Sequence, residues 1–226
     1  MITPEDINAL LLTLRLAFVS TAVLLVAGTP LAWWLAHTTR AVKPVCEALV
    51  ALPLVLPPTV LGFYLLIALG PDGPVGGLMQ FFGATPLAFT FAGLVVGSVI
   101  YSLPFVVQPL QDTFASIGRR PAEVAATLGA SPVDRFFTVT LPLARRGFVT
   151  AAVLGFAHTL GEFGVVLMIG GNIPGVTRVA SIAVYDHVER LNYAGAHSLS
   201  LSLIAISFLL LLAVYGFNRR LRILPV

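Results

Sequence analysis

Five long apolar stretches constrain this chain more than any other feature of its sequence. Each has the length, about 20 residues or more, that an α-helix needs to cross roughly 30 Å of hydrocarbon. They cover residues 10–36, 45–69, 87–110, 148–170 and 198–217. Membrane β-strands are only about ten residues long and alternate in polarity. The sequence therefore predicts an all-α, polytopic membrane helical bundle with about five transmembrane helices, in a single domain over residues 1–226.

Composition supports a membrane protein and excludes several other classes. Hydrophobic residues make up 58% of the chain and charged residues 10%, against roughly 25% charged in soluble domains. The net charge of +3 is too small to indicate a nucleic-acid surface. The single cysteine, Cys46, and the four histidines lack metal-ligand spacing. The only lysine, Lys43, does not lie in a Walker A sequence, so we expect no enzyme activity and no cofactor on this chain alone.

Basic residues predict the orientation in the membrane. Cytoplasmic segments carry an excess of Lys and Arg, and ten of the 13 basic residues fall on the side that holds the C-terminus. We therefore expect the N-terminus outside and the C-terminus inside. The first stretch is longer than a signal-peptide core of about 7–15 residues and follows Glu5 and Asp6, so we expect it to be retained. The ten are Arg40, Lys43, Arg119, Arg120, Arg135, Arg145, Arg146, Arg219, Arg220 and Arg222.

Prolines interrupt the second and third stretches. Each one frees backbone carbonyls that protein or water must satisfy. Two interpretations remain open, namely kinked helices in a packed bundle or helices that line a translocation path. The cluster formed by Pro53, Pro57 and Pro58 favours the path or its gate.

The segment 113–147, between the third and fourth stretches, predicts a short helix–turn–helix. Glu123 suits the first turn of a helix, and Gly129 lies where that helix stops. Ser131 then caps a second helix with Pro132 in its first turn, which we expect to end before Pro142.

Both helices of this helix–turn–helix, which we call its two arms, carry apolar residues that another surface must cover. Val124 and Leu128 share one helical face, and Phe136 and Phe137 follow on the second arm. The arms either lie in the membrane interface or dock into a groove of a cytoplasmic partner.

This segment resembles the EAA-type loop of ABC importer permeases. Residues 123–130 read Glu-Val-Ala-Ala-Thr-Leu-Gly-Ala, and Leu141-Pro142 follows. This sequence differs from the family pattern at one position, where it has Val124 and the family has alanine. In that family the loop is a coupling helix seated in a cleft of the ATP-binding subunit. The resemblance implies an ATPase interface of Glu123, Val124, Ala125, Leu128, Gly129, Ala130 and Phe136.

Two further stretches resemble the molybdate permease branch of that family. They are Leu-Pro-Leu-Val-Leu-Pro-Pro over 52–58, and Leu-Gly-Glu-Phe-Gly over 160–164 with Asn-Ile-Pro-Gly over 172–175. Sulfate/thiosulfate permeases are similar, so sulfate and tungstate remain alternatives to molybdate. The resemblance implies a homodimer in the cytoplasmic (inner) membrane of a prokaryote. Its implied partners are two ATP-binding subunits, which hold ATP and Mg, and an extracytoplasmic oxyanion-binding protein.

His158 and Glu162 form a candidate intramembrane polar pair. They are four residues apart on one face of a continuous helix, and a charge at that depth is costly unless it is paired or meets water. They either line the path or form a structural hydrogen-bonding pair. A carboxylate is a poor lining for an anion path, so we favour the structural role.

Other interpretations fit the sequence less well. A channel or secondary transporter has no need of the helix pair and shows no internal repeat here. An intramembrane hydrolase needs a nucleophile and base that the spans lack. In the outer segment 172–197, Arg178, Asp186, Glu189 and Arg190 either meet a binding protein, gate the exit or belong to a solvated loop.

Overall fold

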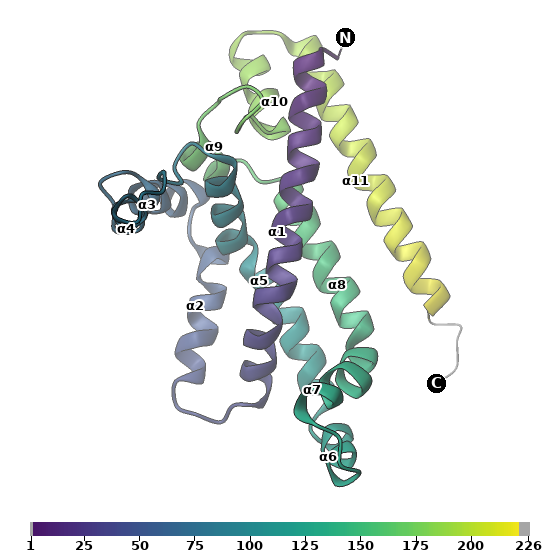
Figure 1. The fold of residues 1–226 in the computed structure, drawn as a ribbon. Helices are drawn as coiled ribbons and strands as arrows, with labels where there is room; N and C mark the ends of the chain where they lie inside the picture. The colour runs from purple at the N-terminus through teal and green to yellow at the C-terminus, as the bar shows by residue number, and fades with distance from the viewer. Residues whose placement is uncertain (1, 222–226) are drawn as a thin grey trace.

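The computed structural model describes residues 2–221, and the side chains of all of these except 213–215 and 217–221. Arg219, Arg220 and Arg222, which enter the orientation argument, lie outside the described side chains. Figure 1 shows long helices that run between two ends of the molecule. The elements are α1 (Pro4–His37), α2 (Lys43–Val55), α3 (Pro58–Leu69), α4 (Pro74–Phe81), α5 (Phe91–Ile117), α6 (Arg120–Thr127), α7 (Pro132–Arg135), the π-helix η1 (Phe136–Thr140), α8 (Leu141–Leu160), α9 (Gly164–Gly170), α10 (Ala180–Glu189) and α11 (Tyr193–Leu221).

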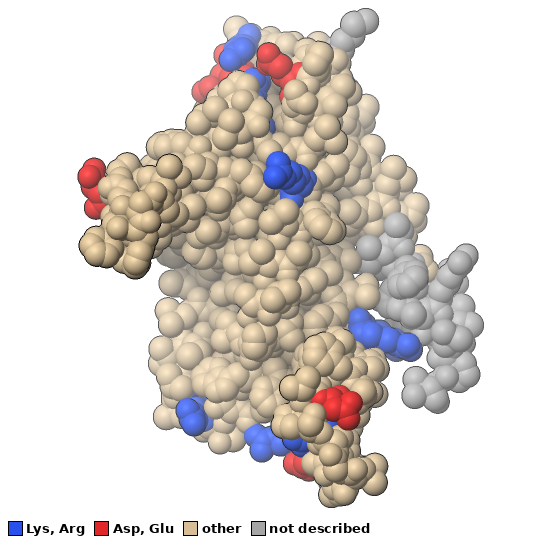
Figure 2. Space-filling model, viewed as in Figure 1, with Lys and Arg blue, Asp and Glu red and all other residues tan. Residues whose placement is uncertain are grey.

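Five segments of the described chain are long and apolar enough to cross a membrane. We call the end that carries α6 and α7 the loop end, and the end where α1 begins the N-terminal end (Figure 1). Charged side chains gather mostly at these two ends in Figure 2, with a broad uncharged band between them. The predicted all-α membrane bundle is confirmed. The segments are Pro4–His37, Pro58–Phe81, Phe91–Ile117, Pro132–Leu160 and Tyr193–Leu212.

The core lies where α1, α5 and α8 pack against one another. Leu24 of α1 and Val106 of α5 are completely buried in it. Glycines let α8 approach α5 closely, because a Cβ at Gly147 would lie 2.1 Å from the Thr113 hydroxyl oxygen, and one at Gly155 would lie 2.7 Å from Val106. Small residues commonly serve this purpose between membrane helices.

The predicted second span, 45–69, is two helices. α2 ends at Val55, and α3 begins at Pro58 after an extended residue, Leu56. Pro58 stands in the first turn of α3, where an amide hydrogen is not needed. Pro53 lies inside α2 without ending it. α3 then turns away from the direction of α2 (Figure 1) and continues towards α4, so the apolar segment is Pro58–Phe81.

The fourth span also differs from the predicted range of 148–170. α7 does not end before Pro142, because it continues through η1 into α8. In η1 the amide of Leu141 donates to the carbonyl of Phe136, five residues back, and this wider turn accommodates the ring of Pro142. α8 ends at Leu160, and α9 begins only at Gly164, so this span is broken near its far end.

The remaining differences concern boundaries and short helices. The third span runs over Phe91–Ile117 instead of 87–110 and takes the first residues of the predicted loop 113–147. α4 and α10 were not predicted, and α11 begins at Tyr193 instead of residue 198. α4 has eight residues and α10 has ten. Both are shorter than the roughly 20 apolar residues of a membrane span, so a search for spans does not find them.

Candidate functional site

The predicted helix–turn–helix projects from the loop end of the bundle, at the bottom of Figure 1. We call α6, α7 and the turn between them the coupling arms. Gly129 ends the first arm with a φ of 86°, a left-handed conformation that favours glycine. The amide of Ala130 donates to the carbonyl of Ala125 at 3.1 Å, which closes the turn. The hydroxyl of Ser131 then accepts from the amide of Asp134 at 3.2 Å, as expected for an N-cap.

The arms present an uncovered apolar surface. Leu128 is 83% exposed, Val124 is 61% exposed, and Val133 and Phe137 are also exposed. Apolar residues in such a cluster commonly mark an interaction site. Of the residues predicted for the ATPase interface, Val124, Leu128 and Gly129 therefore lie on the outer surface, and their role there stays a prediction.

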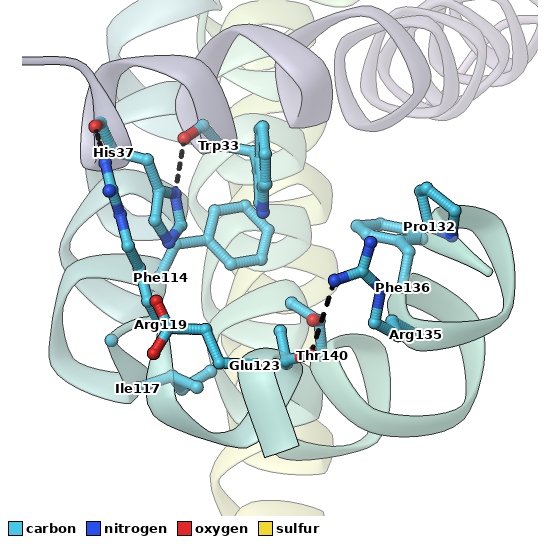
Figure 3. Close-up of a pocket in the computed structure, with 12 residues that line it drawn as sticks. Trp33, His37, Phe114, Ile117, Arg119, Glu123, Pro132, Arg135, Phe136 and Thr140 are labelled. Carbon is cyan, nitrogen blue, oxygen red and sulfur yellow. Dashed lines mark hydrogen bonds between the residues drawn. The ribbon is translucent and has the colours of Figure 1, made fainter. Parts of the chain in front are cut away.

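Glu123 and Phe136 face a different way, towards a cavity of about 290 Å³ between the arms and the bundle (Figure 3). Sequence reasoning missed the other residues of this cavity, among them Trp33, Arg119 and Arg135. Trp33 comes from the far end of α1, and its proximity is a tertiary effect with no local signal.

Two arginines fasten the arms in place. Arg119 donates to the backbone carbonyl of His37 at the end of α1, and Arg135 donates to the carbonyl of Ala122 in α6 at 3.5 Å. The sequence shows these arginines only as positive charges. Arg119 therefore ties the arms to the bundle and Arg135 ties the two arms to each other, while their apolar side stays uncovered.

The structure does not pair His158 with Glu162. The Nδ1 atom of His158 lies 2.9 Å from the hydroxyl of Ser102, and neither carboxyl oxygen of Glu162 has a hydrogen-bond partner among the described residues. The expected i,i+4 pair requires a continuous helix, and α8 ends at Leu160 between the two residues. Glu162 is nevertheless only 3% exposed.

One cavity brings together three of the predicted residues, Pro58, His158 and Glu162. It has a volume of about 550 Å³ and lies where the break before α3 meets the break between α8 and α9. We call it the break cavity. Of the other prolines, Pro53 is buried in α2 and Pro57 caps α3 from the N-terminal side, and neither lines this cavity.

At the N-terminal end, charged residues of the predicted outer segment pair with one another. Arg178 is 6% exposed and donates to Asp186 at 2.6 Å and to Glu5 of α1 at 3.4 Å. Arg190 also contacts Asp186, at 3.1 Å. Arg178 is thus held against α10 by Asp186 and reaches α1 through Glu5, and because Arg178 and Asp186 are buried, neither is part of a solvated loop.

Comparison with known proteins decides the family. Residues 28–223 match the model of the family described as binding-protein-dependent transport system inner membrane component. The chain belongs to this family. The predicted resemblance to ABC importer permeases is confirmed.

The permease is similar over nearly its whole length to curated relatives. It is 62% identical over 218 residues to the molybdenum transport system permease protein ModB of Azotobacter vinelandii, which covers 96% of both chains. It is 35% identical to ModB of Escherichia coli strain K12, covering 94% of this chain and 93% of that one. The probable sulfate transport system permease protein cysT of Chlorella vulgaris is 32% identical, covering 95% of this chain and 80% of that one.

Solved structures share the fold of the permease. A bacterial ABC transporter involved in the import of the acidic polysaccharide alginate superposes with a TM-score of 0.78 at 17% identity, covering 96% of this chain and 80% of that one. The inward-facing MetNI methionine ABC transporter gives a TM-score of 0.69 at 17% identity, covering 95% and 94%. At this identity the likeness concerns the fold alone.

Proposed function

We propose that this permease is the membrane-spanning subunit of an ABC importer for molybdate, with residues 1–226 as one transmembrane domain. The observation that carries the proposal is the 62% identity to a molybdenum transport permease over 96% of both chains. The sulfate relative is 32% identical. Sulfate and tungstate are therefore the competing substrates.

Energy for transport comes from a partner. Lys43 is the only lysine and lies outside any Walker A sequence, so ATP and Mg bind to two separate ATP-binding subunits. The exposed apolar side of the coupling arms, with Val124 and Leu128, supports docking into a cleft of these subunits. An extracytoplasmic binding protein delivers the anion, and two copies of the permease form the path.

The proposed orientation places the loop end in the cytoplasm. The described basic residues Arg119, Arg120, Arg135, Arg145 and Arg146 all lie on the coupling arms or on the helix ends next to them. This agrees with the excess of positive charge on the cytoplasmic side of membrane proteins. The protein then resides in the inner membrane of a prokaryote, with its N-terminus outside.

Transport by the reconstituted complex tests the proposal. Proteoliposomes contain the permease, its co-purifying ATP-binding subunit and the binding protein, and take up labelled molybdate or labelled sulfate. We expect ATP-dependent uptake of molybdate in preference to sulfate, and no uptake when the Walker A lysine of the ATP-binding subunit is replaced. Preferred uptake of sulfate contradicts the substrate, and uptake without ATP contradicts the whole class in favour of a channel or secondary transporter.

A further inference from the structure

The break cavity is formed by two interrupted spans in direct contact. A Cβ atom placed on Gly164 would lie 2.7 Å from the Cβ of Pro58 and 3.4 Å from the amide nitrogen of Thr59. The start of α3 and the gap between α8 and α9 therefore touch. Irregular backbone at membrane depth is tolerated only where it is buried in protein or lines a water-filled cavity. The cavity of about 550 Å³ satisfies this requirement.

Hydrogen bonds connect the ring of His158 to two neighbouring hydroxyl groups. The Ser102 hydroxyl lies 2.9 Å from Nδ1 of His158 and 3.0 Å from the hydroxyl of Thr159. In the arrangement in which Thr159 donates to Ser102 and Ser102 donates to Nδ1, both hydroxyl hydrogens have an acceptor. The ring proton then lies on Nε2, which has no partner in the described chain. Stacking on Phe105, with ring centroids 3.9 Å apart, holds the ring in this position.

Two hydroxyl groups line the same cavity. Thr59 lies in the first turn of α3 and is exposed to the cavity, and Tyr101 comes from α5. Neither hydroxyl hydrogen-bonds to a described residue, so both are free to donate. With His158, three residues that carry neutral donors line this cavity, and they come from three different helices, α3, α5 and α8. None of the described residues that line the cavity is Lys or Arg.

Glu162 completes the wall of the cavity. The hydroxyl of Ser181 donates to its backbone carbonyl at 2.6 Å and so fixes its backbone. Both of its carboxyl oxygens are buried and meet no described cation; the neutral hydroxyl of Ser98 lies near the carboxyl group but forms no regular hydrogen bond with it. A buried carboxyl group without a partner is much less costly as the neutral acid than as the carboxylate. As the neutral acid, Glu162 adds no charge that would repel an anion.

We propose that the break cavity is a passage site for a tetrahedral oxyanion, held by hydrogen bonds from Thr59, Tyr101 and His158. The inference rests on the proposed function and adds the place in the permease where the anion pauses. The cavity has room for a hydrated anion, since one water occupies about 30 Å³ in the liquid. Tight anion binding uses charge-assisted contacts. A site made of neutral donors binds the anion weakly and releases it, as a transport path requires.

Thiol protection tests the site directly. In a Cys46→Ser background, Thr59→Cys places a thiol in the cavity of the purified permease–ATPase complex, and a maleimide reports its accessibility. We expect molybdate alone to slow the labelling with a saturable concentration dependence. Asp72→Cys, in the exposed loop between α3 and α4, is the control and should label at a constant rate. Labelling of Thr59→Cys that molybdate does not slow, or a thiol that never reacts, overturns the inference.

A hydroxyl deletion tests the contribution of one donor to transport. Tyr101→Phe should lower molybdate uptake about five-fold, the effect of losing a hydrogen bond of about 1 kcal/mol. ATP turnover stimulated by the loaded binding protein should stay normal, which a merely structural defect would not allow. Tyr64→Phe is the matched control, because Tyr64 is exposed on α3 outside the cavity. Equal uptake in both variants contradicts the site, whereas no molybdate uptake by the wild-type complex contradicts the proposed function itself.

Discussion

Glu162 allows a direct test of whether a charged carboxylate is needed at its position, because Gln has nearly the same shape and carries no charge. Its carboxyl group is buried and meets no described cation, so the neutral amide of Gln should replace the neutral acid at little cost. We expect Glu162→Gln to keep uptake and to leave the melting temperature of the complex in detergent nearly unchanged. Glu162→Ala should lower that temperature, because it leaves a cavity at a cost of about 1–3 kcal/mol. Loss of uptake in both variants with normal assembly would instead place the charged carboxylate in the mechanism.

Gly129 offers a second test at this scale. Its φ of 86° disfavours any other residue by about 1–2 kcal/mol, although nothing lies within 4 Å of an added Cβ. We expect Gly129→Ala to distort the turn between the coupling arms and to weaken pull-down of the ATP-binding subunit. Gly83→Ala is the control, since Gly83 has a φ of 74° and equally open space outside the arms. Equal pull-down by both variants would contradict a role of this turn in docking.

The role of a residue could be predicted where it depends only on its neighbours in the sequence. Gly129 and Ser131 were identified as a helix stop and a helix cap, and both have the expected geometry. The pairing of His158 with Glu162 was not predictable in the same way, because it depends on whether α8 continues past Leu160. Ser102, the actual partner of His158, lies 56 residues away in the sequence.

At the scale of the element, α6 carries the test of partner docking. Val124 is 61% exposed on its outer side. Val124→Asp should abolish pull-down of the ATP-binding subunit, because it places a charge in an apolar interface, while the permease still inserts and dimerises. Val188→Asp, at a position 43% exposed on α10 at the other end, should have no effect on pull-down. If Val124→Asp binds the ATPase normally, a membrane-surface role for the arms is the better account.

A buried ion pair holds the segment before α10 against that helix. Removing Arg178 takes away the buried 2.6 Å partner of Asp186 and leaves it only the exposed Arg190, which costs at most the roughly 3–5 kcal/mol of a broken buried pair. We expect Arg178→Met to lower the melting temperature strongly. Arg190→Met should matter little, because this side chain is 68% exposed and surface pairs contribute about 0–1 kcal/mol. The double variant Arg178→Met/Asp186→Asn should recover part of the loss, and no recovery would contradict pairing as the cause.

Helices could be predicted from the sequence where they depend only on the residues within them. The apolar length of a span is a property of one stretch of sequence, and all five spans are predicted, although the second and the fourth are displaced. The continuation of α7 through Pro142 was not predictable, because it requires the π-helical turn η1. The breaks at Pro57 and at 161–163 likewise depend on how two distant spans meet.

At the scale of the whole molecule, the orientation in the membrane awaits a test. Asp72 lies in the exposed turn between α3 and α4, and Ser131 lies in the exposed turn between the coupling arms at the loop end. In a Cys46→Ser background, an impermeant thiol reagent added to intact cells should label Asp72→Cys and not Ser131→Cys. Both should react after the cells are opened, which controls for accessibility. Labelling of Ser131→Cys from outside would reverse the orientation inferred from the basic residues.

Continuity between the coupling arms and α8 has a mechanical consequence. Pro132–Leu160 is one helical rod of 29 residues without a loop, roughly 43 Å long at 1.5 Å per residue. In the proposed complex, a movement of the arms would therefore be carried along this helical segment to its other end, beside His158. The segment is first interrupted at residues 161–163, in the wall of the break cavity. The helix on which the ATP-binding subunit is proposed to act thus ends where the anion is proposed to pass.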